Sequence, residues 1–555
     1  MSIDVNAVSF HYPDGTPAVD ELSFKAASGV VTAIVGPNGV GKTTLLELIA
    51  GDLNASEGVI SIDGDVAYMR QNPGFDGSDT PTVGDALALG LSPELRKQYA
   101  LLQDLFVRAA TDVDAGMAIG DALDRWSGLG GYEIEATFDQ ITRTVLREDY
   151  DSARSRPLNQ LSGGERKRLI LNSFLVSPVP VLILDEPDNF LDLHGKAWLD
   201  EQLRASKKTI LMVSHDRSLL TTAVDRILVL EHNSAWMHGG TYATLPQARQ
   251  ERAERLAKDV DRWNEEERRL FRNYKIMKQR ASISPDMAKR ADAAQSRWER
   301  YRDAGPPLAP PPAKEITTRF VGSRSGRVAL KATNFEVPDL FLPFDLTIWN
   351  EDRVLLLGEN GVGKSTMLRM LRDTSLSVGE GLEATLRFGP TAKVGYFSQD
   401  NRVSFSDLLS KDAPLLDVVG QRFGNEPAAR KALGRYGLSN HVRHTMRELS
   451  GGQKARVQMI MLETEQPNVL LLDEPTDNLD LESILSIEVA LSDLEATLVC
   501  ISHDREFAEI FDRFILFDRD GMVAESLDRD EALSIASHSN FSLLDFPKLE
   551  MLTSS

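Results

Sequence analysis

The sequence predicts an α/β protein in which one domain occurs twice, with an α-helical hairpin between the two copies. Four motifs return in the same order: GPNGVGKTT, LSGGERKR, VLILDEP and VSHDR are followed by GENGVGKST, LSGGQKAR, VLLLDEP and ISHDR. Short apolar runs precede several of these motifs, as is typical of buried parallel strands. Between the copies, about 80 residues carry apolar side chains at helical spacing.

The composition limits the class of protein. The chain has 555 residues, of which 42% are hydrophobic, so it can form several packed domains and is not disordered throughout. Its net charge of -21 excludes a surface that is basic everywhere, so any nucleic-acid contact must be local. Cys500 is the only cysteine, which rules out a disulfide within the chain and fits a cytoplasmic protein. We expect no membrane insertion, because no apolar run approaches the roughly 20 residues that cross a bilayer.

The first copy contains an insertion. Ser162 and Ser450 are 288 residues apart, whereas Gln71 and Gln399 are 328 apart, so the first copy has 40 extra residues between its glutamine and LSGG. Apolar residues at helical spacing within about residues 95–130 predict that this insertion is a helical arm. The alternative is a somewhat larger helical subdomain that contacts no partner.

The segment between the copies predicts an antiparallel coiled-coil hairpin. Its apolar residues recur every three or four positions on both sides of residues 282–286, where turn residues break the pattern. The stretch GPPLAPPP at 305–312 predicts an extended, proline-rich return to the second copy. We therefore expect domains at 1–240, 241–320 and 321–545, followed by a short tail at 546–555.

Each copy contains a phosphate-binding loop, or P-loop. GPNGVGKT and GENGVGKS fit G-x-x-x-x-G-K-[ST], in which glycines let backbone N–H groups surround phosphate oxygens at the start of a helix. The lysines, Lys42 and Lys364, would reach the phosphates. The hydroxyl groups of Thr43 and Ser365 would hold Mg²⁺. A chance glycine-rich turn is the alternative, and the second occurrence after an apolar strand disfavours it.

Two acidic residues follow a strand in each copy. Asp185 and Asp473 end apolar runs that predict buried parallel strands, a position suited to holding Mg²⁺ directly or through water. Glu186 and Glu474 come next and leave on the other face, where each could polarise an attacking water. The alternative for a single Asp-Glu pair is a solvated turn, which the apolar strand in both copies disfavours.

Together these motifs resemble the ATP-binding-cassette (ABC) ATPases, and the resemblance covers both copies. It implies two P-loop ABC ATPase domains in tandem that meet head to tail within one monomer. Each ATP would lie between the P-loop of one cassette and the LSGG signature of the other, joining the cassettes until hydrolysis releases them. We call the site with the first P-loop the first composite site, and the other the second. The implied ATP-binding residues are Tyr12, Gly36, Asn38, Gly39, Gly41, Lys42, Thr43, Thr44, Ser162, Gly163, Gly164, Gly358, Asn360, Gly361, Gly363, Lys364, Ser365, Thr366, Ser450, Gly451 and Gly452.

The resemblance also implies catalytic roles beside those of the two glutamates. His215 and His503 follow short apolar strands and would contact the γ-phosphate. A surface turn residue is the alternative for a single histidine, and the matched positions disfavour it. Gln71 and Gln399 resemble the family's glutamine that contacts the metal and the attacking water. Both sites keep every catalytic residue type, so we expect both to hydrolyse ATP.

Two features differ between the copies. Tyr12, 24 residues before Gly36, could stack on adenine, and Phe335 is a weaker counterpart in the second copy. A plain core aromatic is the alternative for each. The turn after the glutamate reads DNFLD at 188–192 and TDNLD at 476–480, which puts equal hydrolysis rates in doubt.

Two cassettes in one chain with a connector of about 80 residues resemble the ABC-F subfamily. That resemblance implies binding at the E site of the ribosome, with 23S rRNA and P-site tRNA as contacts of the connector. The insertion at about 95–130 resembles the ribosome-contacting arm of this subfamily. The alternative function is that of a soluble ATP-binding subunit of an ABC transporter with separate membrane proteins. A DNA-repair ATPase is a third interpretation, which the lack of a cysteine-based zinc site disfavours.

The charge of the connector favours RNA. Residues 268–302 hold eleven basic and three acidic side chains, a net charge of +8, which leaves -29 for the remainder of the chain. Basic charge at the far end of a hairpin suits phosphate contact. A solvated helix face is the alternative. The expected RNA-binding residues are Lys275, Lys278, Arg280, Lys289, Arg290 and Arg297.

Two roles on the ribosome stay open. One is a housekeeping translation factor that rescues stalled peptidyl transfer, and the other is antibiotic resistance by displacing a drug from the ribosome. Resistance members often have a long loop at the hairpin tip, whereas the tip expected here, at about 281–286, is short. The short tip leans slightly toward the housekeeping role.

Overall fold

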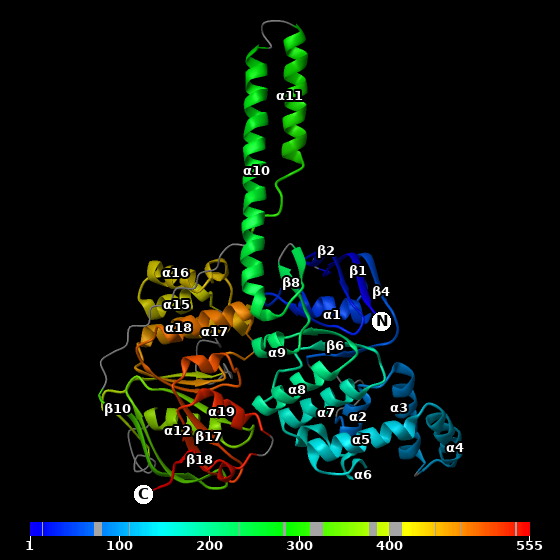
Figure 1. The fold of residues 1–555 in the computed structure, drawn as a ribbon, viewed down its shortest axis with the longest axis vertical. Coiled ribbons are helices and arrows are strands. Elements are labelled where there is room, and N and C mark those ends of the chain that lie inside the picture. The colour runs from blue at the N-terminus through cyan, green and yellow to red at the C-terminus, as the bar shows by residue number, and fades with distance from the viewer. Residues whose placement is uncertain are drawn as a thin grey trace. The chain divides into compact units, whose positions relative to one another are not determined.

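The structure is a computed structural model of the whole chain. It describes residues 1–13, 15–71, 80–109, 111–231, 234–280, 285–310, 326–376, 386–398, 413–449, 451–477, 479–538 and 541–554. These residues form two compact units: one comprises Met1–Gly239 with Glu315–Ser555, and the other is Gly240–Lys314. The first unit contains both copies of the repeated domain, and the second contains the helical hairpin (Figure 1).

The first cassette is built on a six-stranded sheet in the order β5-β6-β7-β3-β8-β9. All neighbouring pairs are parallel except β8 and β9. The strands are β3 (Val31–Val35), β5 (Val66–Met69), β6 (Val181–Asp185), β7 (Thr209–Val213), β8 (Arg226–Glu231) and β9 (Ser234–His238). A separate antiparallel sheet, β2-β1-β4, is made of β1 (Ile3–His11), β2 (Pro17–Ala26) and β4 (Glu57–Ile62).

The second cassette repeats this topology, in the order β14-β15-β16-β12-β17-β18-β19. Its strands are β12 (Arg353–Gly358), β14 (Val394–Ser398), β15 (Val469–Asp473), β16 (Thr497–Ile501), β17 (Arg513–Phe517), β18 (Val523–Ser526) and β19 (Glu550–Met551). Its antiparallel sheet, β11-β10-β13, is made of β10 (Val328–Val337), β11 (Phe341–Trp349) and β13 (Leu386–Phe388). The predicted fold class, two α/β domains in tandem with a helical linker, is therefore confirmed.

The central strands are buried along their whole length. Every residue of β3, β6 and β7 is buried, which explains why these segments are continuous apolar runs rather than alternating ones. Because the three strands are parallel, their carboxyl ends lie at one edge of the sheet. The P-loop follows β3, Asp185 ends β6 with Glu186 directly after it, and the SHD motif follows β7. The topology therefore brings the repeated motifs together.

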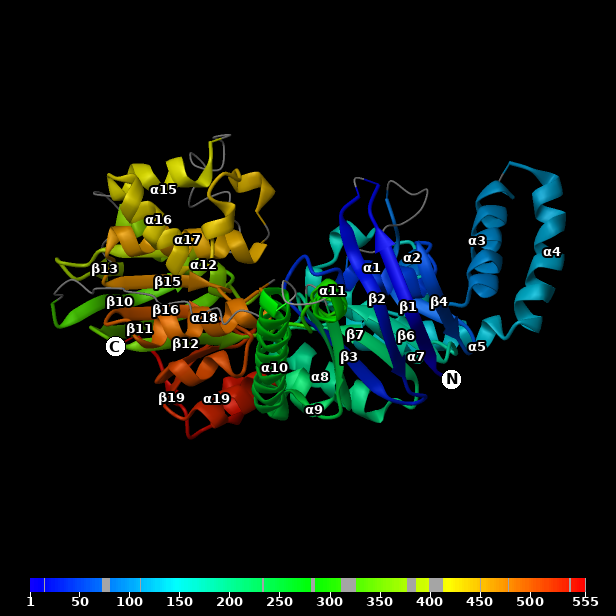
Figure 2. The same cartoon turned by 90° about the horizontal axis from the view of Figure 1, so that it is seen from above.

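Helices cover the sheets and carry the insertion. The insertion contains α3 (Pro93–Arg108) and α4 (Val113–Gly128), which pack side by side (Figure 2). Trp126 of α4 is fully buried, with its indole N–H donating to Glu135 of α5 (Gly131–Leu146) at 3.1 Å. The signature motifs begin α7 (Gly163–Val176) and α17 (Gly451–Glu465).

The helical unit is a hairpin of α10 (Leu245–Arg280) and α11 (Pro285–Asp303), which lie side by side (Figure 1). Aromatic rings join the two helices: Tyr274 stacks on Trp298 with centroids 5.8 Å apart, and Trp263 stacks on Tyr301 at 5.6 Å. These rings therefore form the core of the hairpin, as their heptad spacing indicates. Residues 281–284 at the tip and 311–312 of the proline-rich stretch lie outside the described residues.

A search of the described helices for a stretch long and apolar enough to cross a membrane finds none.

Candidate active site

Both P-loops are turns that glycine alone fits. Gly41 has φ +97°, and a Cβ at this position would lie 2.4 Å from the carbonyl oxygen of Ala18. Gly363 has φ +100°, and a Cβ there would meet the Phe341 ring at 2.8 Å. Helices α1 (Lys42–Ala50) and α12 (Lys364–Leu376) begin at the next residue. Each loop therefore ends at the N-terminus of a helix, where free N–H groups favour phosphate.

The P-loop lysines are buried inside their own loops. Lys42 Nζ donates to the carbonyl oxygen of Gly36 at 2.8 Å and to that of Pro37 at 3.1 Å. Lys364 Nζ donates to Gly358 at 2.7 Å and to Glu359 at 2.8 Å. Burial lowers the pKa of both ammonium groups. A phosphate next to either lysine would offset this loss of solvation.

A hydroxyl and a carboxylate meet beside each P-loop. Thr43 Oγ1 donates to Asp185 Oδ2 at 3.0 Å, and Ser365 Oγ donates to Asp473 Oδ1 at 3.1 Å. Burial raises the pKa of both aspartates. The other oxygen of Asp185 is buried without a hydrogen-bond partner among the described residues. An orphaned carboxylate oxygen beside a hydroxyl matches the hard oxygen ligands that Mg²⁺ requires, so these residues fit the ion.

The two glutamates have left-handed backbones. Glu186 has φ +48° and Glu474 has φ +47°, a conformation that is unfavourable for residues other than glycine and recurs at functional sites. Burial raises the pKa of both carboxyl groups, as a general base that acts near neutral pH requires. Each glutamate directly follows the last residue of its strand and so lies at the carboxyl edge of the sheet.

Different partners surround the two glutamates. Gln71 donates to the Glu186 carboxylate, as Asn189 does at 2.6 Å. At Glu474 the position of Asn189 is taken by Asp477, whose negative charge adds to the effect of burial in raising the pKa of Glu474. Gln399, the expected counterpart of Gln71, lies outside the described residues. Sequence reasoning noted that these turns differ but did not identify the contact of Asn189.

The two histidines are also in different settings. Both ring nitrogens of His215 are buried with no hydrogen-bond partner among the described residues, and burial lowers the pKa of His215 to about 3. His503 Nε2 lies 3.2 Å from Asn360 Oδ1 and 3.4 Å from the Glu474 carboxylate. An orphaned imidazole beside a P-loop fits a γ-phosphate oxygen that would accept its N–H.

Reciprocal hydrogen bonds join the cassettes at their P-loops. The N–H of Asn38 donates to Asp480 Oδ2 at 3.0 Å, and the N–H of Asn360 donates to Asp192 Oδ2 at 3.2 Å. Each aspartate also caps the helix that follows it, α8 (Leu193–Ala205) or α18 (Leu481–Ser492). Sequence reasoning recorded only that these aspartates match, because a contact between copies leaves no mark on spacing within one copy.

The signature of each cassette lies opposite the P-loop of the other. A Cβ at Gly164 would lie 3.6 Å from Asn360 Nδ2, and one at Gly452 would lie 3.9 Å from Asn38 Nδ2. Ser162 caps α7 and exchanges hydrogen bonds with Glu165 in a capping box. Ser450 lies outside the described residues, and Gly451 is the first residue of α17.

A cavity marks the second composite site. It has a volume of about 460 Å³. The residues around it come from both cassettes and include Ser162, Gly163, Gly164, Lys196, Asn360, Gly361, Gly363, Lys364, Ser365, Thr366, Glu474 and His503. The structure thus brings Glu474 and His503 together with the signature and P-loop residues named here, in one space that is large enough for a nucleotide.

The aromatic side chains proposed for adenine differ in exposure. Tyr12 is 40% exposed, and its hydroxyl group lies 2.6 Å from Thr44 Oγ1. Phe335 is 1% exposed and packs against Phe344 with ring centroids 5.8 Å apart. Phe335 is therefore a core aromatic. Leu340, which the sequence did not single out, lines the cavity of the second composite site.

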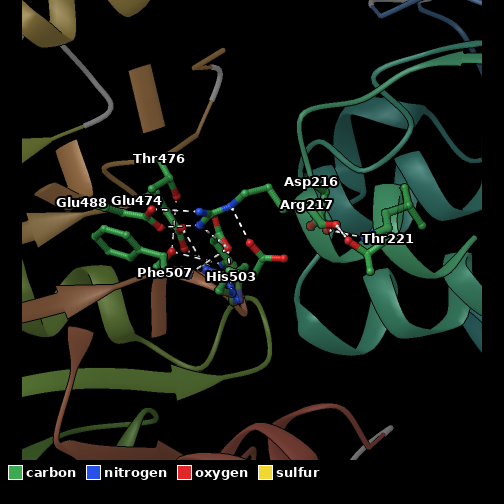
Figure 3. A network of polar contacts seen from close by, with 12 residues as sticks. Asp216, Arg217, Thr221, Glu474, Thr476, Glu488, His503 and Phe507 are labelled. Atoms are coloured by element: carbon green, nitrogen blue, oxygen red, sulfur yellow. Dashed lines mark hydrogen bonds and ion pairs between the residues drawn. The ribbon is translucent and has the colours of Figure 1, made fainter. Parts of the chain in front are cut away.

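An ion-pair network links the cassettes beside this cavity. Arg217, at the start of α9 (Arg217–Thr222), extends across to Glu488 and forms a bidentate pair with its carboxylate (Figure 3). The same guanidinium lies 3.2 Å from Asp504 and 3.1 Å from Glu506. Burial lowers the pKa of Arg217, but the hydrogen bonds to Glu488 and the charges of the nearby carboxylates outweigh burial, so the pKa is raised overall.

The basic side chains of residues 268–302 are all exposed. The eleven lysines and arginines between residues 268 and 302 point to solvent, among them Lys275, Lys278, Arg280, Lys289, Arg290 and Arg297. In the part of the hairpin that the structure describes, neither Lys275 nor Lys278 has a carboxylate partner. Lys278 Nζ instead donates to the Tyr274 hydroxyl at 3.0 Å. Arg269 and Arg302 form ion pairs with Glu266 and Asp303. A group of exposed cations with a net positive charge is suited to a polyanion.

Comparison with known proteins agrees with the motifs. A family model described as "ABC transporter" matches residues 19–189 and 341–477. A protein of Mycobacteroides abscessus named "Antibiotic resistance protein" is 40% identical over 95% of this chain and 99% of its own length. The "Tylosin resistance ATP-binding protein TlrC" of Streptomyces fradiae is 29% identical over 94% of this chain and 98% of its own length.

Solved structures agree on the fold. In the crystal structure of the complex of archaeal ribosomal stalk protein aP1 and archaeal ribosome recycling factor aABCE1, the matched chain has a TM-score of 0.53 and 17% identity. The match covers 92% of this chain and 87% of that chain. At this identity the likeness establishes the shared fold alone.

Proposed function

Because this chain belongs to the ATP-binding-cassette family and has two ATPase domains, we propose that it is an ABC-F ATPase that binds the ribosome and modulates translation. ATP binding would close the two cassettes on each other, and hydrolysis would release them. The ribosomal E site, 23S rRNA and P-site tRNA are the contacts that this proposal implies. The observation that carries it is the charge of the hairpin.

Charge separates the two parts of the hairpin. Residues 245–267 hold five basic and seven acidic side chains, a net charge of -2, whereas residues 268–302 carry +8. A coiled coil that only spaced the cassettes would need no such separation. An RNA surface attracts the cationic part and repels the acidic remainder of the chain, so the charge would also orient the hairpin as it binds.

At each composite site, the chain's own residues would have separate tasks. The P-loop N–H groups and Lys42 or Lys364 would hold the phosphates. Thr43 with Asp185, or Ser365 with Asp473, would hold Mg²⁺, which when bound would neutralise phosphate charge and orient the γ-phosphate. The other site residues act on the water and the γ-phosphate.

Glu186 and Glu474 would orient the attacking water and accept its proton. His215 and His503 would each donate an imidazole N–H to the γ-phosphate. The glycines and serine of the opposite signature would close over the same phosphate, so neither site would be complete without both cassettes.

Ribosome binding can be tested with a variant that holds ATP without cleaving it. Glu186→Gln with Glu474→Gln should bind ATP, stay closed and co-sediment with 70S ribosomes. Without ATP, or with Lys42→Ala and Lys364→Ala added, it should remain in the supernatant. If the double glutamine variant does not bind ribosomes in the presence of ATP, the ribosomal proposal is wrong. The result would then favour the alternative, an ATP-binding subunit that acts with membrane proteins.

The role of the hairpin can be tested against a matched control. Lys275→Ala, Lys278→Ala and Lys289→Ala should weaken co-sedimentation and lower its salt dependence, since each lost phosphate contact reduces the slope of log K against log [salt] by about 0.7–0.9. The control removes three exposed cations from the other part of α10, at Arg255, Lys258 and Arg262. Equal losses in the two variants would mean that net charge alone attracts the ribosome.

The names of the relatives favour antibiotic resistance over a housekeeping role. Two relatives that match most of the chain are named for resistance. Expression of this chain in a susceptible host should raise the minimal inhibitory concentration of at least one antibiotic that acts on the large ribosomal subunit. The Glu186→Gln, Glu474→Gln variant should not protect, because it would stay bound. A host that gains no resistance across such a panel would favour the housekeeping role.

A further inference from the structure

A buried lysine of the first cassette lies in the wall of the second composite site. Lys196, one turn into α8, pairs with Asp216 Oδ2 at 2.9 Å within its own cassette. Its Nζ also donates to the backbone carbonyl oxygen of His503 in the other cassette, at 3.1 Å. Lys196 lines the cavity that Lys364, Glu474 and His503 also line. The roles proposed for Glu474 and His503 do not involve this lysine.

Lys196 is held as a cation despite its burial. Its side chain is 15% exposed, and that of Asp216 is 8% exposed. Although burial disfavours the charge, Asp216 and then Asp188 keep the pKa of Lys196 above its ordinary value. Asp477 of the second cassette, which neighbours Glu474, also attracts the ammonium. The cation therefore lies between carboxylates from the two cassettes.

The second cassette has no such lysine. The offset of 288 residues places Ile484 at the position of Lys196 and Thr476 at the position of Asp188. Ile484 is 3% exposed and belongs to the apolar core. Thr476 is uncharged, unlike Asp188, and its Oγ1 lies 3.4 Å from Ser502 Oγ. Asp188 and Lys196 are thus replaced together in the second cassette. Asp216, the direct partner of Lys196, has a counterpart in Asp504, which pairs with Arg217 instead of a lysine.

The contacts of the two histidines follow this difference. Lys196 donates to the backbone carbonyl of His503, and Nε2 of His503 lies against Asn360 and Glu474, while its Nδ1 has no partner among the described residues. At the first composite site, Ile484 cannot donate to the backbone of His215. There the ring nitrogens of His215 have no partner among the described residues. The cross-cassette contact and the engaged histidine occur at the same site.

We propose that Lys196 is a positioning residue for ATP hydrolysis at the second composite site: its ammonium crosses from the first cassette and holds the loop that carries His503. Lys196 touches the backbone of His503 and not the reacting atoms, so it acts through the histidine. Hydrolysis at the second site thereby depends on the first cassette through a contact that the first site lacks. The two sites would then differ in their rate of ATP hydrolysis because only one of them has this contact.

The test measures each site separately, with the full chain and without ribosomes. Glu186→Gln leaves hydrolysis to the second site, and Glu474→Gln leaves it to the first. Adding Lys196→Met should lower kcat about tenfold in the Glu186→Gln chain, with KM for ATP changed less than about twofold. In the Glu474→Gln chain the same substitution should lower kcat by less than about twofold. Lys196→Arg should restore most of the loss.

Two further variants separate positioning from folding. Lys196→Ile with Asp188→Thr installs the residues that the second cassette has at these two positions. One of the two carboxylates beside Lys196 is then removed with it, and the other, Asp216, keeps the attraction of Arg505. This variant should show the same loss of kcat at the second site. Arg204→Met, on the exposed face of the same helix, should leave kcat unchanged. Equal losses in the Glu186→Gln and Glu474→Gln chains would show a general structural role and overturn the proposal.

A readout that is independent of the glutamates completes the test. Amide hydrogen exchange of the peptide that contains His503 should be faster in Lys196→Met than in the unsubstituted chain, because the backbone at His503 loses its contact. Unchanged exchange in this peptide would contradict the proposal even if activity fell. If the single glutamine variants kept full activity, the assigned general bases would be wrong, and the exchange result would still decide the role of Lys196.

Discussion

The N–H of Asn38 in the first P-loop donates to the carboxylate of Asp480 in the second cassette, at 3.0 Å. The mirror contact joins Asn360 to Asp192 at 3.2 Å. Because each aspartate also caps the helix behind it, one carboxylate connects a P-loop to the rigid body of the other cassette. A movement of either P-loop on binding phosphate would therefore act directly on the helix that the aspartate caps in the other cassette.

Neutralising this carboxylate should weaken the link without removing the cap. Asp480→Asn keeps an amide oxygen that can cap α18, since Asn is as good an N-cap as Asp, but loses the charge that strengthens the bond to Asn38. We expect ATPase activity to fall about tenfold, with the free energy of unfolding reduced by less than about 1 kcal/mol. Steady-state ATPase and chemical denaturation measure the two quantities. Asp480→Ala, which also removes the cap, is the comparison, and equal stability losses in both variants would contradict the argument.

The Arg217 network should contribute strongly to cassette pairing. Arg217→Ala leaves Glu488, Asp504 and Glu506 without their shared cation, and breaking a buried pair costs about 3–5 kcal/mol. Thermal unfolding should therefore begin at a lower temperature. Arg505, the equivalent residue of the second cassette, donates to Ser218 and Leu193 at 3.5 Å, which is a weaker set of contacts, so Arg505→Ala should have a smaller effect. If the two alanine variants unfold alike, the network does not stabilise the pair.

The dependence of ATPase activity on Mg²⁺ should require the strand-end aspartates, Asp185 and Asp473. Asp185→Asn with Asp473→Asn preserves the shape of each side chain but removes the charge that fits the ion. We expect kcat to fall at least about 100-fold at saturating ATP, and more Mg²⁺ to be needed for half-maximal rate. A Mg²⁺ titration of ATPase activity, with EDTA as the zero point, measures both. Asp4→Asn, at an exposed carboxylate paired with Lys25, serves as the control and should titrate like the original chain.

His215 should make the folded chain sensitive to acid. Burial lowers its pKa from 6.5 to about 3, so between these values the unfolded chain binds a proton that the folded chain does not. Stability therefore falls as the pH falls through this window, by about 2 kcal/mol from this group at pH 5. His215→Gln should lose less stability than the original chain between pH 7 and pH 5, as measured by urea denaturation. Identical losses in the two proteins would mean that His215 can take up a proton while folded.

Much of each ATP site could be predicted because its residues are fixed by local sequence. The G-x-x-x-x-G-K-[ST] spacing specifies a glycine turn followed by a helix, and the structure has both at Gly41 and Lys42. Asp185 ends a strand whose residues are all buried, as its apolar run indicates. The repeat made these local predictions stronger, since a chance motif would not recur at matched positions with the same neighbours.

The sequence by itself determined the elements, their order and the residues at the carboxyl ends of the strands, because periodicity and turn chemistry act over a few neighbours. Only the tertiary structure decided which residues meet across the cassettes. Lys196 and His503 are 307 positions apart. Nothing in the spacing of either copy foretold their contact, because it depends on how two separately folded surfaces fit. The same fit put Phe335 in a core and left Tyr12 exposed, although both are aromatic residues on related hairpins.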